Sequence, residues 1–120
     1  MRKYKNYLVW KNSKELVKVI YMATRKIPET EKYGLTSQIR RAAVSIPANI
    51  AEGSGRRTEK DFRGFLHIAL GSCFELDTLL ELSVDLKYLE EEEVDPILEN
   101  LLKIQKQLNS LITKVSSSIP

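Results

Sequence analysis

The sequence predicts an all-α protein whose helices share one core. Four segments repeat apolar residues at helical spacings of three and four, namely residues 8–26, 33–54, 58–87 and 92–115. Prolines, glycines or acidic residues separate these segments. At 120 residues the chain is expected to form a single domain over residues 1–120, with a frayed tail at 116–120.

The first helix, residues 8–26, is amphipathic. Its apolar face carries Val9, Leu16, Ile20, Ala23 and Ile27, and its other face carries Lys11, Lys14, Lys18 and Arg25. Pro28 is expected to end the helix, because proline lacks the amide donor that a continuing helix needs.

The second helix, residues 33–54, contains a proline and a row of polar side chains. Its apolar face carries Ile39, Ala42, Ala43, Ile46 and Ile50, and the polar row is Arg41, Ser45, Asn49 and Glu52. Small residues flank this row, so we expect it to be partly buried and paired. Pro47 predicts a bend and a freed carbonyl at Ala43, which the hydroxyl of Ser45 would satisfy. Thr36 or Thr30 is the expected N-cap.

A corner rich in glycine and arginine follows. Gly53-Ser54-Gly55 is expected to stop the second helix, Arg56 and Arg57 come next, and Thr58–Asp61 reads as a capping box for the third. Guanidinium groups beside free helix amides predict a phosphate site. The alternative is a tight corner whose arginines pair with acids such as Glu52 or Glu59.

The third helix, residues 58–87, has the broadest apolar arc. One seam is Phe62, Leu66, Ala69, Cys73, Leu76, Leu80 and Val84, and a second is Phe65, Ile68, Leu79, Leu82 and Leu86. This arc is wider than one neighbour needs, so the helix should contact two helices or a second subunit. Small residues at 69–73 predict a close approach of the second helix near Ser45 to Asn49. Glu75 would then pair with Arg41 or accept a hydrogen bond from Asn49.

The fourth helix, residues 92–115, has four consecutive acids at its start. Glu90 to Glu93 favour the positive end of the helix dipole, which explains them without a metal ion. The apolar repeat is Val94, Ile97, Leu101, Ile104, Leu108, Leu111 and Val115.

Charge is distributed unevenly along the chain. Residues 1–60 carry 14 Lys and Arg against 5 Asp and Glu, whereas residues 61–120 carry 5 against 11. If each half supplies two helices, the bundle has a basic side and an acidic side, which suits head-to-tail contacts between identical subunits. The alternative is two solvated faces that never meet.

The run Ser-Ile-Pro-Ala-Asn-Ile-Ala-Glu-Gly, residues 45–53, carries a resemblance to a known family. With Gln38 and Arg41 before it and Gly55-Arg56 after it, this run resembles the signature of the bacterial 23S rRNA intervening-sequence protein family. The similarity extends from Leu8 to Leu111, with further matches at Trp10, Tyr21, Ala69-Leu70-Gly71-Ser72 and Glu75-Leu76.

The resemblance implies an antiparallel, up-and-down four-helix bundle that assembles into a ring, commonly a pentamer. The family is named after the rRNA intervening sequences in which its genes were found. It is similar to basic accessory proteins of diversity-generating retroelements, which points to nucleic-acid binding.

Catalytic and metal-binding patterns are missing from the sequence. A di-iron bundle needs Glu-x-x-His, but the single histidine, His67, has Gly64 three residues before it. One Cys and one His are too few for zinc, and Cys73 falls on the opposite side of the helix from His67. We therefore expect no enzyme activity, metal or cofactor. No apolar run reaches the roughly 18 residues of a membrane span, no signal peptide is expected, and one cysteine fits the cytoplasm.

The expected ligand is nucleic acid, most directly RNA, bound through the basic half. Arg56 and Arg57 are the residues expected to contact phosphate, and Arg40, Lys11, Lys14 and Lys18 complete the basic set. A structural polar cluster is expected from Arg41, Ser45, Asn49, Glu52 and Glu75. The basic N-terminal segment with Tyr4, Tyr7 and Trp10 is either a second nucleic-acid contact or a packing anchor. The alternative function is a structural assembly protein with no nucleic-acid ligand.

Overall fold

The computed structural model describes residues 2–120 and contains four α-helices and no strand in that range. Met1, the first residue of the predicted domain, lies outside it. The helices are α1 (Leu8–Ala23), α2 (Leu35–Ser54), α3 (Glu59–Asp85) and α4 (Glu91–Ser116). Short 3₁₀ turns occur at Tyr4–Asn6, Thr24–Lys26 and Glu29–Glu31.

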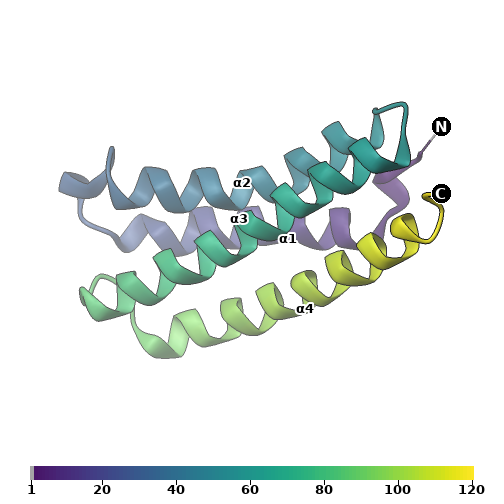
Figure 1. Cartoon of the computed structure of the whole chain (residues 1–120). Helices are drawn as coiled ribbons and strands as arrows, with labels where there is room; N and C mark the ends of the chain where they lie inside the picture. The colour runs from purple at the N-terminus through teal and green to yellow at the C-terminus, as the bar shows by residue number, and fades with distance from the viewer. Residues whose placement is uncertain (1) are drawn as a thin grey trace.

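The helices lie side by side in an elongated molecule of 48 × 24 × 21 Å (Figure 1). α1 and α3 each pack against α2 and α4 and have almost no contact with one another, so they lie on opposite sides of the core. The two termini and the α2–α3 connection lie at one end of the molecule, which we call the terminal end (Figure 1). The α1–α2 and α3–α4 connections lie at the other, the far end.

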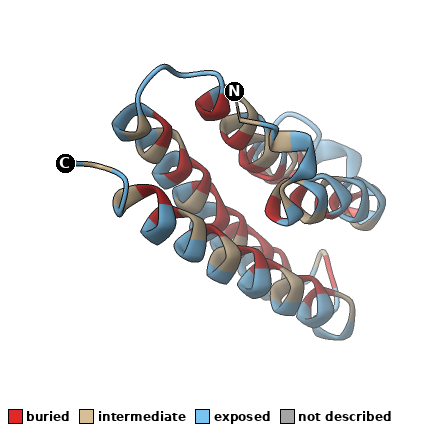
Figure 2. Ribbon diagram, turned by 90° about the vertical axis from the view of Figure 1, so that its right-hand side faces the viewer, coloured by how far each residue is buried: buried red, intermediate tan, exposed pale blue. Residues whose placement is uncertain are grey.

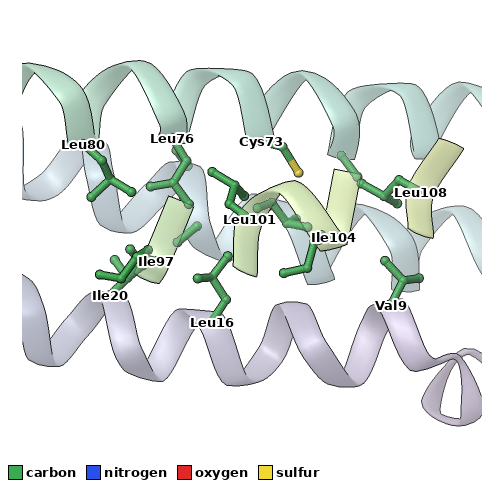
Figure 3. Close-up of a cluster of buried hydrophobic side chains, with 14 of the residues drawn as sticks. Val9, Leu16, Ile20, Cys73, Leu76, Leu80, Ile97, Leu101, Ile104 and Leu108 are labelled. Carbon is green, nitrogen blue, oxygen red and sulfur yellow. The ribbon is translucent and has the colours of Figure 1, made fainter. Parts of the chain in front are cut away.

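Apolar side chains from all four helices form one continuous core (Figure 2). Figure 3 shows Leu16 and Ile20 of α1 facing residues of α3 and α4, among them Leu76 and Ile104. Ile68, Leu82 and Leu86 of the second predicted seam of α3 are exposed. In its first seam and in the repeat of α4 one position each is wrong, because Ser83 is buried in place of Val84 and Ile112 in place of Leu111. Both observed seams advance by about 3.5 residues per turn, the step at which a helix keeps facing a neighbouring helix.

Two helices end earlier than predicted. α1 stops at Ala23, where the hydroxyl of Thr24 donates to the carbonyl of Ile20 at 2.7 Å and the chain tightens into a 3₁₀ turn. α3 stops at Asp85, because Lys87 adopts a left-handed conformation with φ of 63°. The amides of Tyr88 and Leu89 then donate to the carbonyl of Ser83 at 2.9 and 3.2 Å. A lysine in this role gives no sequence signal, since glycine is the usual residue there.

The sequence predicted the N-cap of α3 only in part and made no prediction for that of α4. At α3, Thr58 accepts from the amide of Asp61 at 3.1 Å, which is one of the two hydrogen bonds of the predicted capping box. At α4 a complete capping box forms, in which the amide of Glu90 donates to Glu93 at 2.9 Å. This hydrogen bond lowers the pKa of Glu93 below its ordinary value, and the ammonium group of Lys26, whose Nζ lies 2.6 Å from Glu93 Oε2, lowers it further.

The predicted cap of α2 is wrong. Gly34 occupies the N-cap, Thr36 is buried inside the helix, and Thr30 lies in a 3₁₀ turn. The carboxylate of Glu31 instead accepts from the amide of Leu35 at 3.1 Å. The preceding turn thus supplies the acceptor that a threonine cap would have supplied.

Candidate nucleic-acid interface

The corner between α2 and α3 is built on a close helix contact at Gly53. A Cβ atom on Gly53 would lie 2.5 Å from Cβ of Phe65 and 3.1 Å from Phe62. Only glycine lets the two helices approach this closely. α2 ends one residue later at Ser54, so Arg56 and Arg57 fall in the short exposed connection before α3.

The N-terminal segment closes this corner from outside. Arg2 donates from Nη1 to the carbonyls of Ser54, at 3.1 Å, and Arg56, at 2.6 Å, and it also pairs with Glu59. Its guanidinium lies 4.5 Å from the ring centroid of Phe62. Arg2 therefore ties the start of the chain to residues more than fifty positions away. No sequence signal indicated this role.

The aromatic residues of the same segment are packing anchors. Tyr7 stacks on Phe62 with centroids 6.4 Å apart, and Tyr4 meets Trp10 edge-on at 5.3 Å. Burial raises the pKa of Tyr7. These rings are engaged within the bundle, which favours the anchor interpretation of the segment.

The two corner arginines differ in their contacts. Arg56 pairs with Glu52 at 3.2 Å and lies 4.6 Å from the ring centroid of Phe65. Both charged side chains of this pair are about half exposed, so it is a weak contact of a few tenths of a kcal/mol. Arg57 is exposed and makes no hydrogen bond or ion pair with any of residues 2–120. The predicted alternative of paired arginines thus holds for Arg56 only.

A surface hollow of about 460 Å³ lies at this corner, lined by Arg2, Ser54, Gly55, Arg56, Arg57 and Glu59. It belongs to the more basic half of the molecule. The half of the molecule between the helix midpoints and the terminal end comprises residues 2–15, 45–72 and 104–120. This half carries 11 Lys and Arg against 4 Asp and Glu. The far half carries 8 against 12. Charge therefore differs between the two ends as well as between the two halves of the sequence.

The other predicted basic residues lie away from this hollow. Arg40 donates to Thr24 Oγ1 at 2.9 Å and to the carbonyl of Tyr21 at 3.3 Å, and its guanidinium lies 4.5 Å from the Tyr21 ring centroid. These contacts join α2 to the end of α1, so Arg40 is already engaged. Lys11, Lys14 and Lys18 are exposed along α1. Lys14 lies over Trp10 and Lys18 pairs with Glu15 at 3.0 Å.

The predicted polar cluster is brought together only in part. Asn49 Nδ2 donates to both the carbonyl and the hydroxyl oxygen of Ser45 at 2.8 Å, and Ser72 Oγ of α3 lies 2.8 Å from Ser45 Oγ. The hydroxyl of Ser45 is thus engaged with Asn49 and Ser72, and the expected bond to the carbonyl of Ala43 does not form in the described chain. α2 continues unbroken through Pro47.

The charged members of that cluster lie at the surface. Arg41 and Glu75 are exposed and line a cleft of about 350 Å³ between α2 and α3, but they form no ion pair within the described residues. The expected Arg41–Glu75 pair is therefore wrong for the single chain, and Asn49 bonds to Ser45 instead of Glu75. Glu52 is exposed and pairs with Arg56. Solvation by water explains why these charges can stay apart.

The remaining reactive side chain is Cys73. Burial raises the pKa of its thiol to about 12, so the thiolate needed for nucleophilic chemistry is scarce at neutral pH. Among residues 2–120, no group of three or more His, Cys, Asp or Glu is placed to hold a metal ion. No helix in that part of the chain is long and apolar enough to cross a membrane.

Comparison with known proteins gives a family from the sequence and a similar solved structure. The family profile described as 23S rRNA-intervening sequence protein matches residues 5–110. A crystal structure of a protein with unknown function from the S23 ribosomal protein family of Bacteroides thetaiotaomicron VPI-5482 is similar, with a TM-score of 0.78. It is 30% identical over 88% of this chain and 98% of that one. No curated protein matches the chain.

Proposed function

Because the chain belongs to the 23S rRNA-intervening sequence protein family, we propose that it is a non-enzymatic bundle that binds RNA through its terminal end. In this proposal the subunit is an antiparallel, up-and-down bundle bent at Pro47, and several copies assemble in the cytoplasm into a ring, pentameric in the simplest form. The consecutive helix connections at alternate ends of the molecule support the up-and-down order (Figure 1).

One observation carries the RNA proposal. Arg57 presents a guanidinium with no partner in the described chain, beside the first turn of α3 and inside the basic half. A guanidinium binds phosphate with paired hydrogen bonds, and free amides at a helix start add a favourable field. Arg56 can add a second contact by exchanging its exposed Glu52 partner for phosphate.

RNA binding is tested by fluorescence anisotropy of labelled structured RNA, single strands and duplex at low salt. We expect Arg57→Ala combined with Arg56→Ala to weaken binding about tenfold or more and to reduce its salt dependence, because two phosphate contacts are lost. The matched control is Lys103→Ala, which removes an exposed cation from the middle of α4. Absence of binding to all three nucleic acids, or an equal loss in the control, would overturn the proposal.

A purely structural assembly protein is the second candidate. It is favoured by the basic residues that already have partners within the chain, Arg2, Arg40 and Arg56. Under this alternative the wild-type protein forms its ring and binds none of the three nucleic acids. Sedimentation together with the anisotropy measurement therefore separates the two candidates.

A further inference from the structure

Three hollows at the terminal end share their walls. The first is the hollow of about 460 Å³ at the α2–α3 corner. A second, of about 200 Å³, shares Arg2 and Glu59 with the first. A third, of about 420 Å³, lies between the start of α1 and the C-terminal part of α4, and it shares Tyr7, Leu111 and Lys114 with the second. The three hollows therefore form one continuous depression, which we call the terminal trough.

The part of the terminal trough between α1 and α4 is apolar. Leu8, Val9 and Leu111 line it, and we call this part the apolar groove. Leu8 is 62% exposed, so a ligand in the groove would cover apolar surface that now faces water. Tyr7 also lines the groove and is held by its stacking on Phe62. A wall that is already fixed loses little conformational entropy when a ligand binds.

Positive charge accompanies the trough from one end to the other. Lys106 and Lys114 of α4 line the apolar groove, and both side chains are exposed without a hydrogen bond or ion pair to any of residues 2–120. Arg57 lies at the opposite end and is equally free within that range. Of the described residues that line the trough, the single acid is Glu59, and it pairs with Arg2. The trough therefore attracts anions along its whole length.

A single strand of RNA matches this combination of charge and apolar surface. Its phosphates bind guanidinium and ammonium groups, and its unpaired bases cover apolar side chains. In a duplex the base faces are stacked on one another, so a duplex leaves the apolar groove uncovered. An acidic peptide also suits an apolar groove beside lysines, but the trough begins at the arginine corner to which the proposed function assigns phosphate. The observations therefore favour a nucleic acid over a peptide.

We propose that the terminal trough holds an unpaired RNA strand, with its phosphates on Arg57, Lys114 and Lys106 and its bases against the apolar groove. This inference rests on the proposed function and states which form of RNA the site takes. The two lysines belong to residues 61–120, which carry 5 Lys and Arg against 11 Asp and Glu. Charge along the sequence therefore gave no sign of them, and the fold brings them to the basic end.

The first test compares forms of RNA by fluorescence anisotropy of the full chain at low salt. The probes are a short labelled oligouridine and its duplex with oligoadenylate, and unlabelled polyphosphate serves as a competitor without bases. Oligouridine is chosen because its bases stack little on one another and are free to meet the protein. We expect it to bind about tenfold or more tightly than the duplex, and polyphosphate to displace it poorly.

The apolar groove is tested by Leu8→Ser, which removes an exposed apolar side chain. We expect this variant to bind oligouridine about threefold or more weakly and to bind the duplex as the wild type does, because only unpaired bases cover the groove. The matched control is Leu102→Ser, since Leu102 is 49% exposed on α4 and lines none of the three hollows. Circular dichroism checks that both variants are folded.

The two lysines are tested together by Lys106→Ala with Lys114→Ala. We expect affinity for oligouridine to fall about tenfold and the slope of log affinity against log salt to decrease by about two, because two phosphate contacts are lost. The matched control is Lys103→Ala, which removes an exposed cation of α4 outside the trough.

The outcomes separate this inference from the proposed function. If the duplex binds as tightly as oligouridine, or if the Leu8 and lysine variants bind oligouridine like the wild type, the trough assignment is overturned while RNA binding stands. An equal loss in the matched controls overturns it as well. Binding of a labelled acidic amphipathic peptide in place of oligouridine would assign the trough to a protein partner. Absence of binding to every nucleic acid would overturn both proposals.

Discussion

At the scale of single residues, the helical glycines fall into two groups. Gly53 lies where α2 touches α3, and an added Cβ would lie 2.5 Å from Phe65. Gly64 is in the interior of α3, where an added Cβ would meet nothing within 4 Å. The same residue type thus permits a close helix contact in one place and leaves a helix weaker in the other.

Substituting these two glycines should change stability in opposite directions. Gly53→Ala is expected to lower the free energy of unfolding by about 1–3 kcal/mol, because the methyl group forces the helices apart. Gly64→Ala is expected to raise it by up to about 1 kcal/mol through better helix propensity. Urea denaturation of both variants measures the difference. Equal effects of the two substitutions would mean that the Gly53 contact is looser than described.

At the scale of elements, α2 and α3 form the most extensive helix pair in the molecule. Small residues of both helices meet where Oγ of Ser45 and Oγ of Ser72 lie 2.8 Å apart. Asn49, one turn further along α2, donates a hydrogen bond to Ser45 Oγ. The polar row of α2 is therefore joined to α3 at its uncharged members. Its charged ends, Arg41 and Glu52, remain in solvent.

A double-mutant cycle tests the link between the two helices. Ser45→Ala and Ser72→Ala are each expected to lower the free energy of unfolding by about 1 kcal/mol, the usual contribution of one hydrogen bond. The double variant should lose less than the sum of the two, because both changes break the same contact. Thermal or urea unfolding of the four proteins gives the coupling energy, and strict additivity would show that the serines act separately.

At the scale of the whole molecule, the chain start and the α2–α3 corner form one unit. Arg2 binds two carbonyls of that corner and Glu59, and only about one sixth of its side chain is exposed. Because both termini lie at this end, the N-terminal segment adds positive charge beside Arg56 and Arg57 and holds the backbone carbonyl of Arg56 (Figure 1).

Removing the Arg2 contacts should therefore destabilise the fold. Arg2→Ala is expected to lower the free energy of unfolding by about 1–3 kcal/mol, since the carbonyls of Ser54 and Arg56 lose a charged donor. Lys3→Ala is the matched control, because Lys3 is exposed and its loss should change the stability by less than about 0.5 kcal/mol. Chemical denaturation of the two variants checks the expectation. A stable Arg2→Ala protein would show that the corner holds without the N-terminal segment.

The sequence by itself determined which segments are helical and which side chains face the core. The apolar repeats of α2 and most of those of α1, α3 and α4 are buried where their spacing places them, because the side-chain direction in a helix depends on local geometry alone. The small residues near Ser72 also indicated where α2 approaches α3, and the family signature lies in the same pair of helices. The C-terminal ends of α1 and α3, which no glycine follows, were predicted less accurately.

Only the tertiary structure decided the partners of the charged residues. Arg2 reaches Glu59, Arg56 pairs with Glu52, and Arg41 stays apart from Glu75, although all were available to one another by charge. The tertiary structure also leaves Ile68, Leu82 and Leu86 of the predicted second seam exposed. The physical reason is that a long, flexible charged side chain can reach several partners, and a broad apolar arc can be buried against more than one neighbour. The path of the connections and the way the helices cross select one of these arrangements.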